Sequence, residues 1–547
     1  MQEKKVINKK ESFMQGVLAI MFSQVLIKVL GLVYKLYLTN REGFGDTGNA
    51  IYGSGFQIYA LLLTISSIGV PNAISKLVSE RLAIGDNRGA HRIFKIAFVT
   101  FAIVGFAGTL ILFLGAGYIS RVILQIPEAE YTLIALSPSI FFAAIASVVR
   151  GYFNGMENLS ITARSQTFEQ IFKTTLTVMV VELVAIMSGT NTVLMAAGAN
   201  LATSLAVFLS LLYLYRYYMV RRKQIWQNIT TSPINRPERI KSIVKKIMAV
   251  SIPISLSSII SAINKNIDAV TVVRGLKTFL SEAEAKVQYG ILNGKVDTLI
   301  GLPLSFNIAF ATALVPAVSS AIAKKDQSTI QKRVSFSILV TILIGLPCTI
   351  GLCVFADPIL KLLFPNAPAG ATILQVSAFT IIFTVIAQTI NGALQGLGKV
   401  AVPAIALGTG VVVKFILNLI LVPIEQIGVL GAAFSSVVCH IISCTIGFTV
   451  LRKHMKLDLK MSKAIIKPII ATVMMSICSY FIYMKLCLII PERISTVIAL
   501  ISAVIIYALA VIVLKIFTKE DIYMIPYGQK IYKILTKMKI YKEPEIH

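Results

Sequence analysis

The feature that most constrains this chain is a series of long apolar runs that covers nearly its whole length. A hydrocarbon core about 30 Å thick needs roughly 20 apolar residues in a helix. Only 14% of the 547 residues are charged, well below the roughly 25% of a soluble domain. The sequence therefore predicts an all-α integral membrane protein. We expect about fourteen spans, near 13–38, 51–78, 93–118, 131–154, 160–187, 192–215, 247–273, 287–322, 334–356, 370–394, 400–423, 428–451, 465–487 and 494–516.

The charges between the runs predict the orientation. The chain has 52 Lys and Arg residues against 25 Asp and Glu residues. About 36 of the basic residues lie in the N-terminus, the C-terminal tail and alternate loops, and about 8 lie in the opposite loops. Basic loops remain in the cytoplasm, so both termini are expected there. Because the basic residues flank apolar spans, no nucleic-acid partner is expected.

Two halves of the chain share short motifs. Arg150-Gly151-Tyr152-Phe153-Asn154-Gly155 matches Asn391-Gly392-Ala393-Leu394-Gln395-Gly396 at an offset of 241, and Lys173 falls on Lys414 at the same offset. Gly69-Val70-Pro71-Asn72-Ala73 resembles Leu314-Val315-Pro316-Ala317 at an offset of 245. The sequence thus predicts two six-helix lobes in parallel orientation. The glycines Gly151, Gly155, Gly392 and Gly396 are interpreted as close-packing positions.

The repeat divides the chain into six parts. The long spans and the basic segments set the boundaries between them. We expect a cytoplasmic N-terminus (1–12), an N-lobe (13–215), a basic cytoplasmic linker (216–246), a C-lobe (247–451), a basic loop with two added spans (452–516) and an amphipathic basic tail on the membrane surface (517–547).

Several ionisable residues fall inside predicted spans, where a charge is costly and usually faces a cavity or a partner. Lys28 and Lys35 are two helical turns apart and share a face. Lys265 and Asp268 are three residues apart and can pair, and Arg274 lies beyond them. Lys ammonium groups bind phosphate well as compact point charges. We therefore predict a substrate cavity lined by the cations Lys28, Lys35, Lys265 and Arg274.

Other polar residues in spans are weaker candidates for the same cavity or for ion coupling. They are Asp268, Lys295, Asp297 and Asn418, the last as a ligand of a coupling sodium ion. The alternative is that the lysines extend to the membrane interface or neutralise carboxylates structurally. Glu169 and Lys173, four residues apart, are interpreted first as such a structural pair.

No motif for catalysis or metal binding occurs in the sequence. There is no phosphate-binding loop, nucleophile elbow or metal-hydrolase motif. The six cysteines lack a C-x-x-C pair and are interpreted as small buried hydrophobes. We expect no catalytic residues, no metal site and no cofactor. Transport would be driven by a sodium or proton gradient or by the membrane potential.

Several stretches resemble the polysaccharide-biosynthesis branch of the multidrug/oligosaccharidyl-lipid/polysaccharide exporter superfamily. The likeness is greatest to the stage V sporulation protein B group and to MurJ-type lipid II flippases of Gram-positive bacteria. The stretches are Lys28-Val29-Leu30-Gly31, Gly69-Val70-Pro71-Asn72-Ala73-Ile74-Ser75-Lys76-Leu77-Val78, Arg150-Gly151-Tyr152-Phe153-Asn154-Gly155, Ser165-Gln166-Thr167-Phe168-Glu169-Gln170, Lys519-Glu520-Asp521-Ile522 and Ile525-Pro526-Tyr527-Gly528. Leu61-Leu62-Leu63-Thr64 lacks the arginines that Gram-negative lipid II flippases carry there.

The resemblance implies a fourteen-helix, two-lobed flippase in the bacterial cytoplasmic membrane, not an enzyme. Its substrate would be a lipid-linked diphosphate glycan, namely lipid II, with Lys28 and Lys35 at basic cavity positions of the family. Membrane lipids are the other expected partners, and a monomer is expected. The alternatives are a flippase for a teichoic or capsular unit, a cation-coupled drug antiporter, a polyprenyl-phosphate glycosyltransferase, and a scaffold for the cell-wall or spore-coat machinery.

Overall fold

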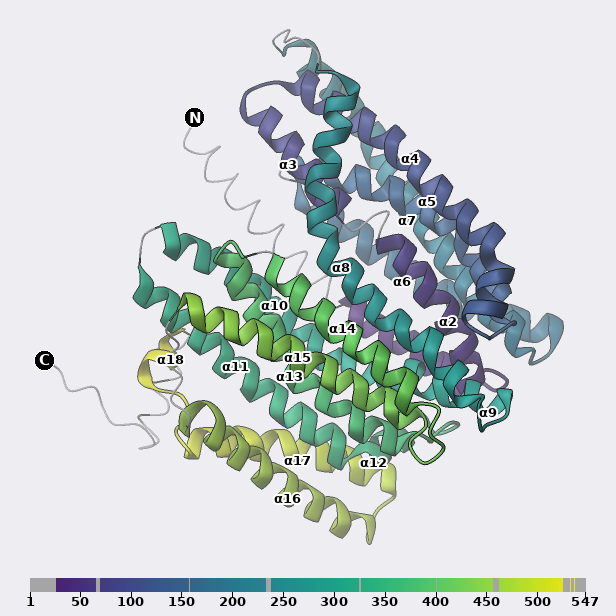
Figure 1. Ribbon diagram of the computed structural model, residues 1–547, viewed down its shortest axis with the longest axis vertical. Coiled ribbons are helices and arrows are strands. Elements are labelled where there is room, and N and C mark those ends of the chain that lie inside the picture. The colour runs from purple at the N-terminus through teal and green to yellow at the C-terminus, as the bar shows by residue number, and fades with distance from the viewer. Residues whose placement is uncertain are drawn as a thin grey trace, which may run out of the picture. The chain divides into compact units, whose positions relative to one another are not determined.

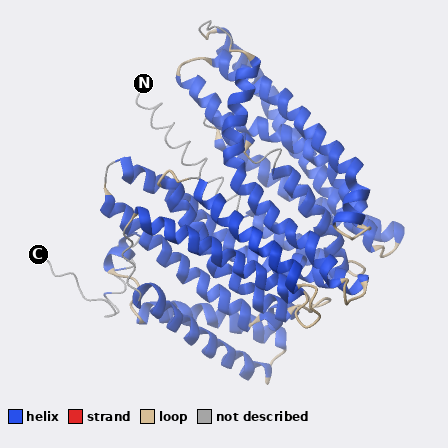
Figure 2. Cartoon of the chain, in the orientation of Figure 1, coloured by secondary structure: helices blue, strands red, loops and turns tan. Residues whose placement is uncertain are grey.

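The fold is described from a computed structural model. The structure describes residues 26–64, 69–156, 158–232, 238–323, 326–399, 401–455 and 462–524, together with residues 532 and 536. Every regular element in this part of the chain is helical, and the rest is loop or turn (Figure 2). The all-α fold class is confirmed.

The helices follow the long apolar runs (Figure 1). The first described helix covers 26–40. Next come α2 (Gly45–Leu63), α3 (Val70–Ala83), α4 (Asn87–Tyr118), α5 (Ala129–Gly155), α6 (Leu159–Ser188), α7 (Thr192–Thr230), α8 (Ile240–Leu276), α9 (Glu282–Gly290) and α10 (Asp297–Ala323). They are followed by α11 (Gln327–Val354), α12 (Ala356–Leu363), α13 (Ala371–Gly396), α14 (Ala401–Leu421), α15 (Val429–His454), α16 (Lys467–Cys487), α17 (Glu492–Val513) and α18 (Lys519–Met524). Short π-helical segments occur at Ile119–Ile123, Ile291–Val296 and Ser462–Ile466.

Ten helices in the described residues are long and apolar enough to cross a membrane. They coincide with ten of the predicted spans, so the chain is a multi-pass membrane protein. The other four predictions, near 13–38, 51–78, 247–273 and 287–322, fall on helices that are interrupted, only partly described or rich in polar residues. The total of fourteen stays a prediction.

Two predicted non-spanning segments can be compared with the described residues. Helix α7 continues to Thr230 and α8 begins at Ile240, so both ends of the predicted linker 216–246 are helical. Most of the predicted surface tail 517–547 lies outside the described residues.

The described chain forms two compact units. The first comprises Met1–Thr298 and Val411–Ser435, and the second comprises Leu299–Gly410 and Ser436–His547. In the first unit, α4, α5 and α7 pack side by side (Figure 1). Their core includes Phe94, Tyr152 and Phe153. The predicted lobe boundaries follow the sequence repeat and stay a prediction.

Glycines of α5 allow α3 to pack closely in the first unit. A Cβ at Gly151 would lie 2.9 Å from the Pro71 backbone, and one at Gly155 would lie 2.8 Å from Val78 Cβ. Because real Cβ atoms do not approach other heavy atoms this closely, neither position can hold a larger residue unless the neighbouring atoms of α3 shift.

The second unit contains the same arrangement between α13 and α10. A Cβ at Gly392 would lie 2.4 Å from the Ala311 carbonyl oxygen, and one at Gly396 would lie 2.7 Å from Val318 Cβ. Val78 therefore corresponds to Val318, at an offset of 240. The offset of 245 that the short motifs predicted for this pair of spans is wrong by five residues. The short motifs align similar residues, whereas the glycine contacts show which residues of α3 and α10 occupy equivalent positions.

Candidate functional site

The predicted polar residues of the first unit lie on the first described helix, α8, the π-helical segment Ile291–Val296, the first residue of α10 and α14. Lys295 in the π-helical segment is fully buried, and its Nζ lies 2.9 Å from Asp46 Oδ2 on α2. Close backbone contact supports this pair, because a Cβ at Gly290 would lie 1.9 Å from the Asp46 carbonyl oxygen. Lys295 is thus a structural counter-ion of Asp46.

Asp268 on α8 forms the second buried ion pair. Lys414 Nζ on α14 lies 2.6 Å from Asp268 Oδ2 and donates a second hydrogen bond to the Asn264 carbonyl at 3.1 Å. Asn418 donates to Asp268 Oδ1 at 3.0 Å and to Thr271 Oγ1 at 2.9 Å. The expected pairing of Lys265 with Asp268 is wrong, because a lysine 146 residues along the chain takes the carboxylate.

Lys28 and Lys265 are both exposed and interact electrostatically with one another. Within the described part of the chain, neither ammonium group forms an ion pair with a carboxylate. Asp297 is also exposed and acts electrostatically on Lys265 from beyond ion-pair distance. Two like charges on different helices are thus close enough to repel one another, and among the described residues neither is held in an ion pair.

The structure does not bring Arg274 beside this group. It is exposed in the last turn of α8, nine residues and about 13 Å along the helix axis from Lys265. Its assignment as a cavity cation stays a prediction.

Lys35 lies two turns from Lys28 on the first described helix. Only 6% of the residue is exposed, and its Nζ lies 4.8 Å from the Tyr52 ring centroid. The end of this helix is held against α6 by Arg41, which donates to both carboxylate oxygens of Glu182 at 2.9 and 3.0 Å. This bidentate pair fixes the end of the helix against α6.

On α6 the structural pair expected between Glu169 and Lys173 is wrong. Glu169 Oε2 accepts a hydrogen bond from Arg150 Nη2 of α5 at 2.7 Å. Lys173 is buried and its Nζ lies 4.4 Å from the Phe56 ring centroid. Sequence reasoning therefore missed Lys173 as a member of the cluster, although its repeat equivalence to Lys414 was a usable signal.

The balance of charge in this cluster is positive. Asp46 and Asp268 are already neutralised by lysines, and Asp297 is the acid that remains beside them. In the described residues, four lysines of the cluster lack a paired carboxylate: Lys28, Lys35, Lys173 and Lys265. No group of three His, Cys, Asp or Glu side chains in the described residues could hold a metal ion. The arrangement suits an anionic ligand.

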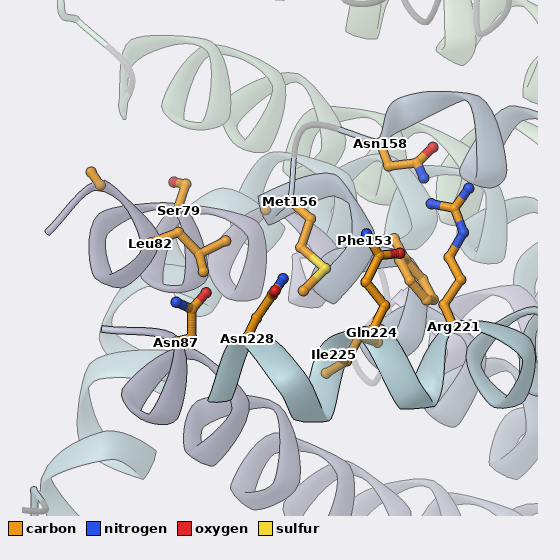
Figure 3. Close-up of a pocket in the computed structure, with 12 residues that line it drawn as sticks. Ser79, Leu82, Asn87, Phe153, Met156, Asn158, Arg221, Gln224, Ile225 and Asn228 are labelled. Atoms are coloured by element: carbon orange, nitrogen blue, oxygen red, sulfur yellow. The ribbon is translucent and has the colours of Figure 1, made fainter. Parts of the chain in front are cut away.

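A pocket of about 400 Å³ lies in the first unit (Figure 3), and none of its lining residues belongs to this cluster. Ser79, Asn158, Arg221 and Asn228 are among the residues that line it. The only charged side chain among the lining residues is Arg221, which stacks on Tyr217 at 4.6 Å. Of the site residues predicted from the sequence, the close-packing Gly155 lines this pocket, whereas none of the predicted cavity or coupling residues does.

Comparison with known proteins identifies the class. Residues 13–322 match the family model described as polysaccharide biosynthesis protein, and residues 295–420 match the MatE model. The chain belongs to the polysaccharide biosynthesis protein family, in the flippase branch of the multidrug/oligosaccharidyl-lipid/polysaccharide exporter superfamily.

Three relatives from Bacillus subtilis (strain 168) resemble most of the chain. An uncharacterised membrane protein, YabM, is 27% identical over 97% of this chain and 98% of its own length. Stage V sporulation protein B is 26% identical over 83% of this chain and 86% of its own length. The lipid II flippase MurJ is 23% identical over 81% of this chain and 82% of its own length.

Solved structures share the fold. A lipid II flippase MurJ in an inward closed conformation has a TM-score of 0.66 at 15% identity, covering 91% of this chain and 98% of its own. An inward-facing multidrug transporter of the MATE family has a TM-score of 0.65 at 16% identity, covering 79% and 94%. These likenesses establish a transporter fold.

Proposed function

We propose that the chain is a flippase that moves a lipid-linked diphosphate glycan, lipid II, across the bacterial cytoplasmic membrane by alternating access, with both termini in the cytoplasm. The observation that carries the proposal is the charge of Lys28 and Lys265, neither of which forms an ion pair with a carboxylate among the described residues. A diphosphate would supply the missing negative charge, because ammonium groups in a membrane bundle need a counter-ion.

The internal neutralisation of the acids supports an anionic substrate over a cationic drug. Asp46 and Asp268 are held by Lys295 and Lys414. A drug cation would therefore have to displace a buried lysine from its carboxylate before it could bind there. The names of the relatives support the lipid-linked class, since the MurJ relative is described as a lipid II flippase.

The proposal is tested in cells that lack their own lipid II flippases and express this chain from an inducible promoter. Lipid II on the outer leaflet of intact cells is measured by its cleavage with an added colicin-type hydrolase. Wild type is expected to restore cleavage, whereas Lys28→Ala and Lys265→Ala are expected to reduce it at equal membrane abundance.

The matched control is Lys76→Ala, which removes an exposed lysine of α3 outside the cluster. It should behave as wild type. Full activity of both cluster variants would contradict the role of the cations. Absence of cleavage with wild type would reject lipid II and favour a teichoic or capsular lipid-linked unit, which labelled precursors in vesicles would identify.

A further inference from the structure

Lys173 on α6 is buried without a carboxylate partner in the described residues. It is 8% exposed, and its Nζ lies 4.4 Å from the Phe56 ring centroid and 5.2 Å from that of Tyr34. The Tyr34 hydroxyl also interacts electrostatically with it. Glu169, one turn away, is occupied by Arg150. Aromatic faces and a phenol stabilise the ammonium group, but they carry no negative charge to neutralise it.

Lys35 lies in the same aromatic environment. Its Nζ is 4.8 Å from the Tyr52 ring, and the Tyr52 hydroxyl lies 3.5 Å from that of Tyr34, beside Lys173. The two lysines interact electrostatically with one another. Asp46 and Asp297 act on Lys35 only from beyond ion-pair distance. In the part of the chain that the structure describes, these two buried ammonium groups thus share one aromatic pocket, formed by Tyr34, Tyr52 and Phe56, without a paired anion.

An unpaired charge is strongly disfavoured in a buried site, and two like charges increase the cost. Natural proteins accept such an arrangement where a ligand completes it, as at sites that bind phosphate. The missing component here is an anion that can contact both lysines. A phosphate group carries enough oxygens to accept from each ammonium group at once.

The structure also provides an approach to this pocket from Lys28. Gly31 lies between Lys28 and Lys35 on the same helix, and among the described residues a Cβ built on it would have only Gln170 Nε2 within 4 Å, at 4.0 Å. The space over Gly31 is therefore open and bordered by an amide group. Gln170 lies one turn before Lys173 on α6, so its NH₂ group can donate to an anion that passes this point.

We propose that Lys35 and Lys173 form an inner phosphate subsite, which a diphosphate reaches from Lys28 across Gly31 and Gln170. Lys173 is thereby a further substrate-positioning residue. This inference rests on the proposed function, because it assigns the diphosphate of the same substrate to the face between the first described helix and α6.

The test measures binding of geranylgeranyl diphosphate to the full chain in lipid nanodiscs. Lys173→Gln and Lys35→Gln are each expected to weaken binding about ten- to a hundredfold, the effect of losing a hydrogen bond to a charged group. Lys76→Gln serves as the control and should bind as wild type. Geranylgeranyl monophosphate should show a smaller loss in the variants than the diphosphate.

A second measurement distinguishes substrate binding from a structural role. Lys173→Met is expected to raise the melting temperature of the ligand-free protein, because it removes an unpaired buried charge. A lysine that stabilises the fold would give a lower melting temperature. Unchanged diphosphate affinity in Lys173→Gln, or a lower ligand-free melting temperature in Lys173→Met, would overturn the subsite.

The outcomes separate this inference from the proposed function. Binding that depends on Lys28 but not on Lys35 or Lys173 would reject the subsite and leave the flippase proposal intact. Binding of phosphatidylglycerol that depends on Lys173, without binding of the isoprenyl diphosphate, would assign the pocket to a membrane lipid and reject the substrate subsite. Absence of any binding to wild type would contradict both.

Discussion

The ammonium group of Lys414 lies 2.6 Å from the carboxylate of Asp268, and each removes the need for an external counter-ion at the other. Lys414 is the repeat equivalent of Lys173, which has no carboxylate partner in the described residues. The two halves therefore place a lysine at the same position with different electrostatic consequences. One lysine completes a buried pair, whereas the other leaves positive charge for a ligand.

Breaking the Lys414–Asp268 pair should destabilise the protein. Lys414→Met leaves the partly buried Asp268 carboxylate without its ion-pair partner, and a loss of up to about 3–5 kcal/mol is expected for such a change. The double variant Lys414→Met/Asp268→Leu should recover most of it. Thermal unfolding in detergent measures both. Equal destabilisation by the single and double variants would contradict the assignment of the pair.

Transport by wild type should not require sodium. Lys414 already supplies the positive charge beside Asp268 and Asn418, where a coupling cation would otherwise be needed. Replacing sodium by choline in reconstituted vesicles should leave the rate of flipping unchanged. In Lys414→Ala, sodium chloride should raise the melting temperature more than choline chloride. A sodium requirement in wild type would show that the coupling ion binds elsewhere.

Filling the space over Gly31 should block the inner subsite. Gly31→Ala should be tolerated, because a Cβ there would meet, of the residues that the structure describes, only Gln170 Nε2 at 4.0 Å. Gly31→Leu should weaken diphosphate binding by about one to two orders of magnitude, comparable with the loss of a charge-assisted hydrogen bond. Binding of the isoprenyl diphosphate to both variants measures this. Equal affinities would place the ligand away from this helix face.

The glycines of α5 and α13 should tolerate no larger side chain. Gly155→Leu and Gly396→Leu are each expected to cost at least about 1–3 kcal/mol, the usual effect of overpacking. The control is Gly301→Ala, because a Cβ at Gly301 meets nothing within 4 Å. Yield of folded protein and melting temperature are the measurements, and wild-type values for both leucine variants would contradict the close helix contact.

The free energy of unfolding should decrease in acid, partly because the carboxylate of Glu238 becomes protonated. Glu238 lies outside the membrane spans. Hydrogen bonds from Lys246 and Ser242, and the neighbouring Arg81, lower the pKa of its carboxyl to about 2. A depressed pKa stabilises the fold above the unfolded value near 4.5, and this contribution is lost as the pH falls toward 2. The partly exposed group should contribute about 1 kcal/mol or less.

The measurement for this contribution is the melting temperature of wild type and Glu238→Gln between pH 7 and pH 3. The variant should melt lower at pH 7, and the two curves should converge as the pH falls. A difference that stays constant over this range would show that the carboxylate charge contributes nothing.

The pattern of long apolar runs along the chain was sufficient to predict the fold class and the location of most helices. Long apolar runs leave only helices as spanning elements, because backbone polar groups cannot remain unpaired in lipid. The repeat was visible through Gly151 and Gly392, but short motifs misplaced α10 by five residues. Register between helices depends on which side chains interdigitate, and similar apolar residues occur at several offsets.

The sequence also identified the lysines that lie within spans, since charge in an apolar run is unusual. It could not identify their partners. Lys265 and Asp268, and Glu169 and Lys173, are close along their helices, so local spacing favoured them. In the structure these acids pair with Lys414 and Arg150, because helix packing places residues far apart in the chain on facing surfaces. Only that packing determines which ammonium groups remain available for a phosphate.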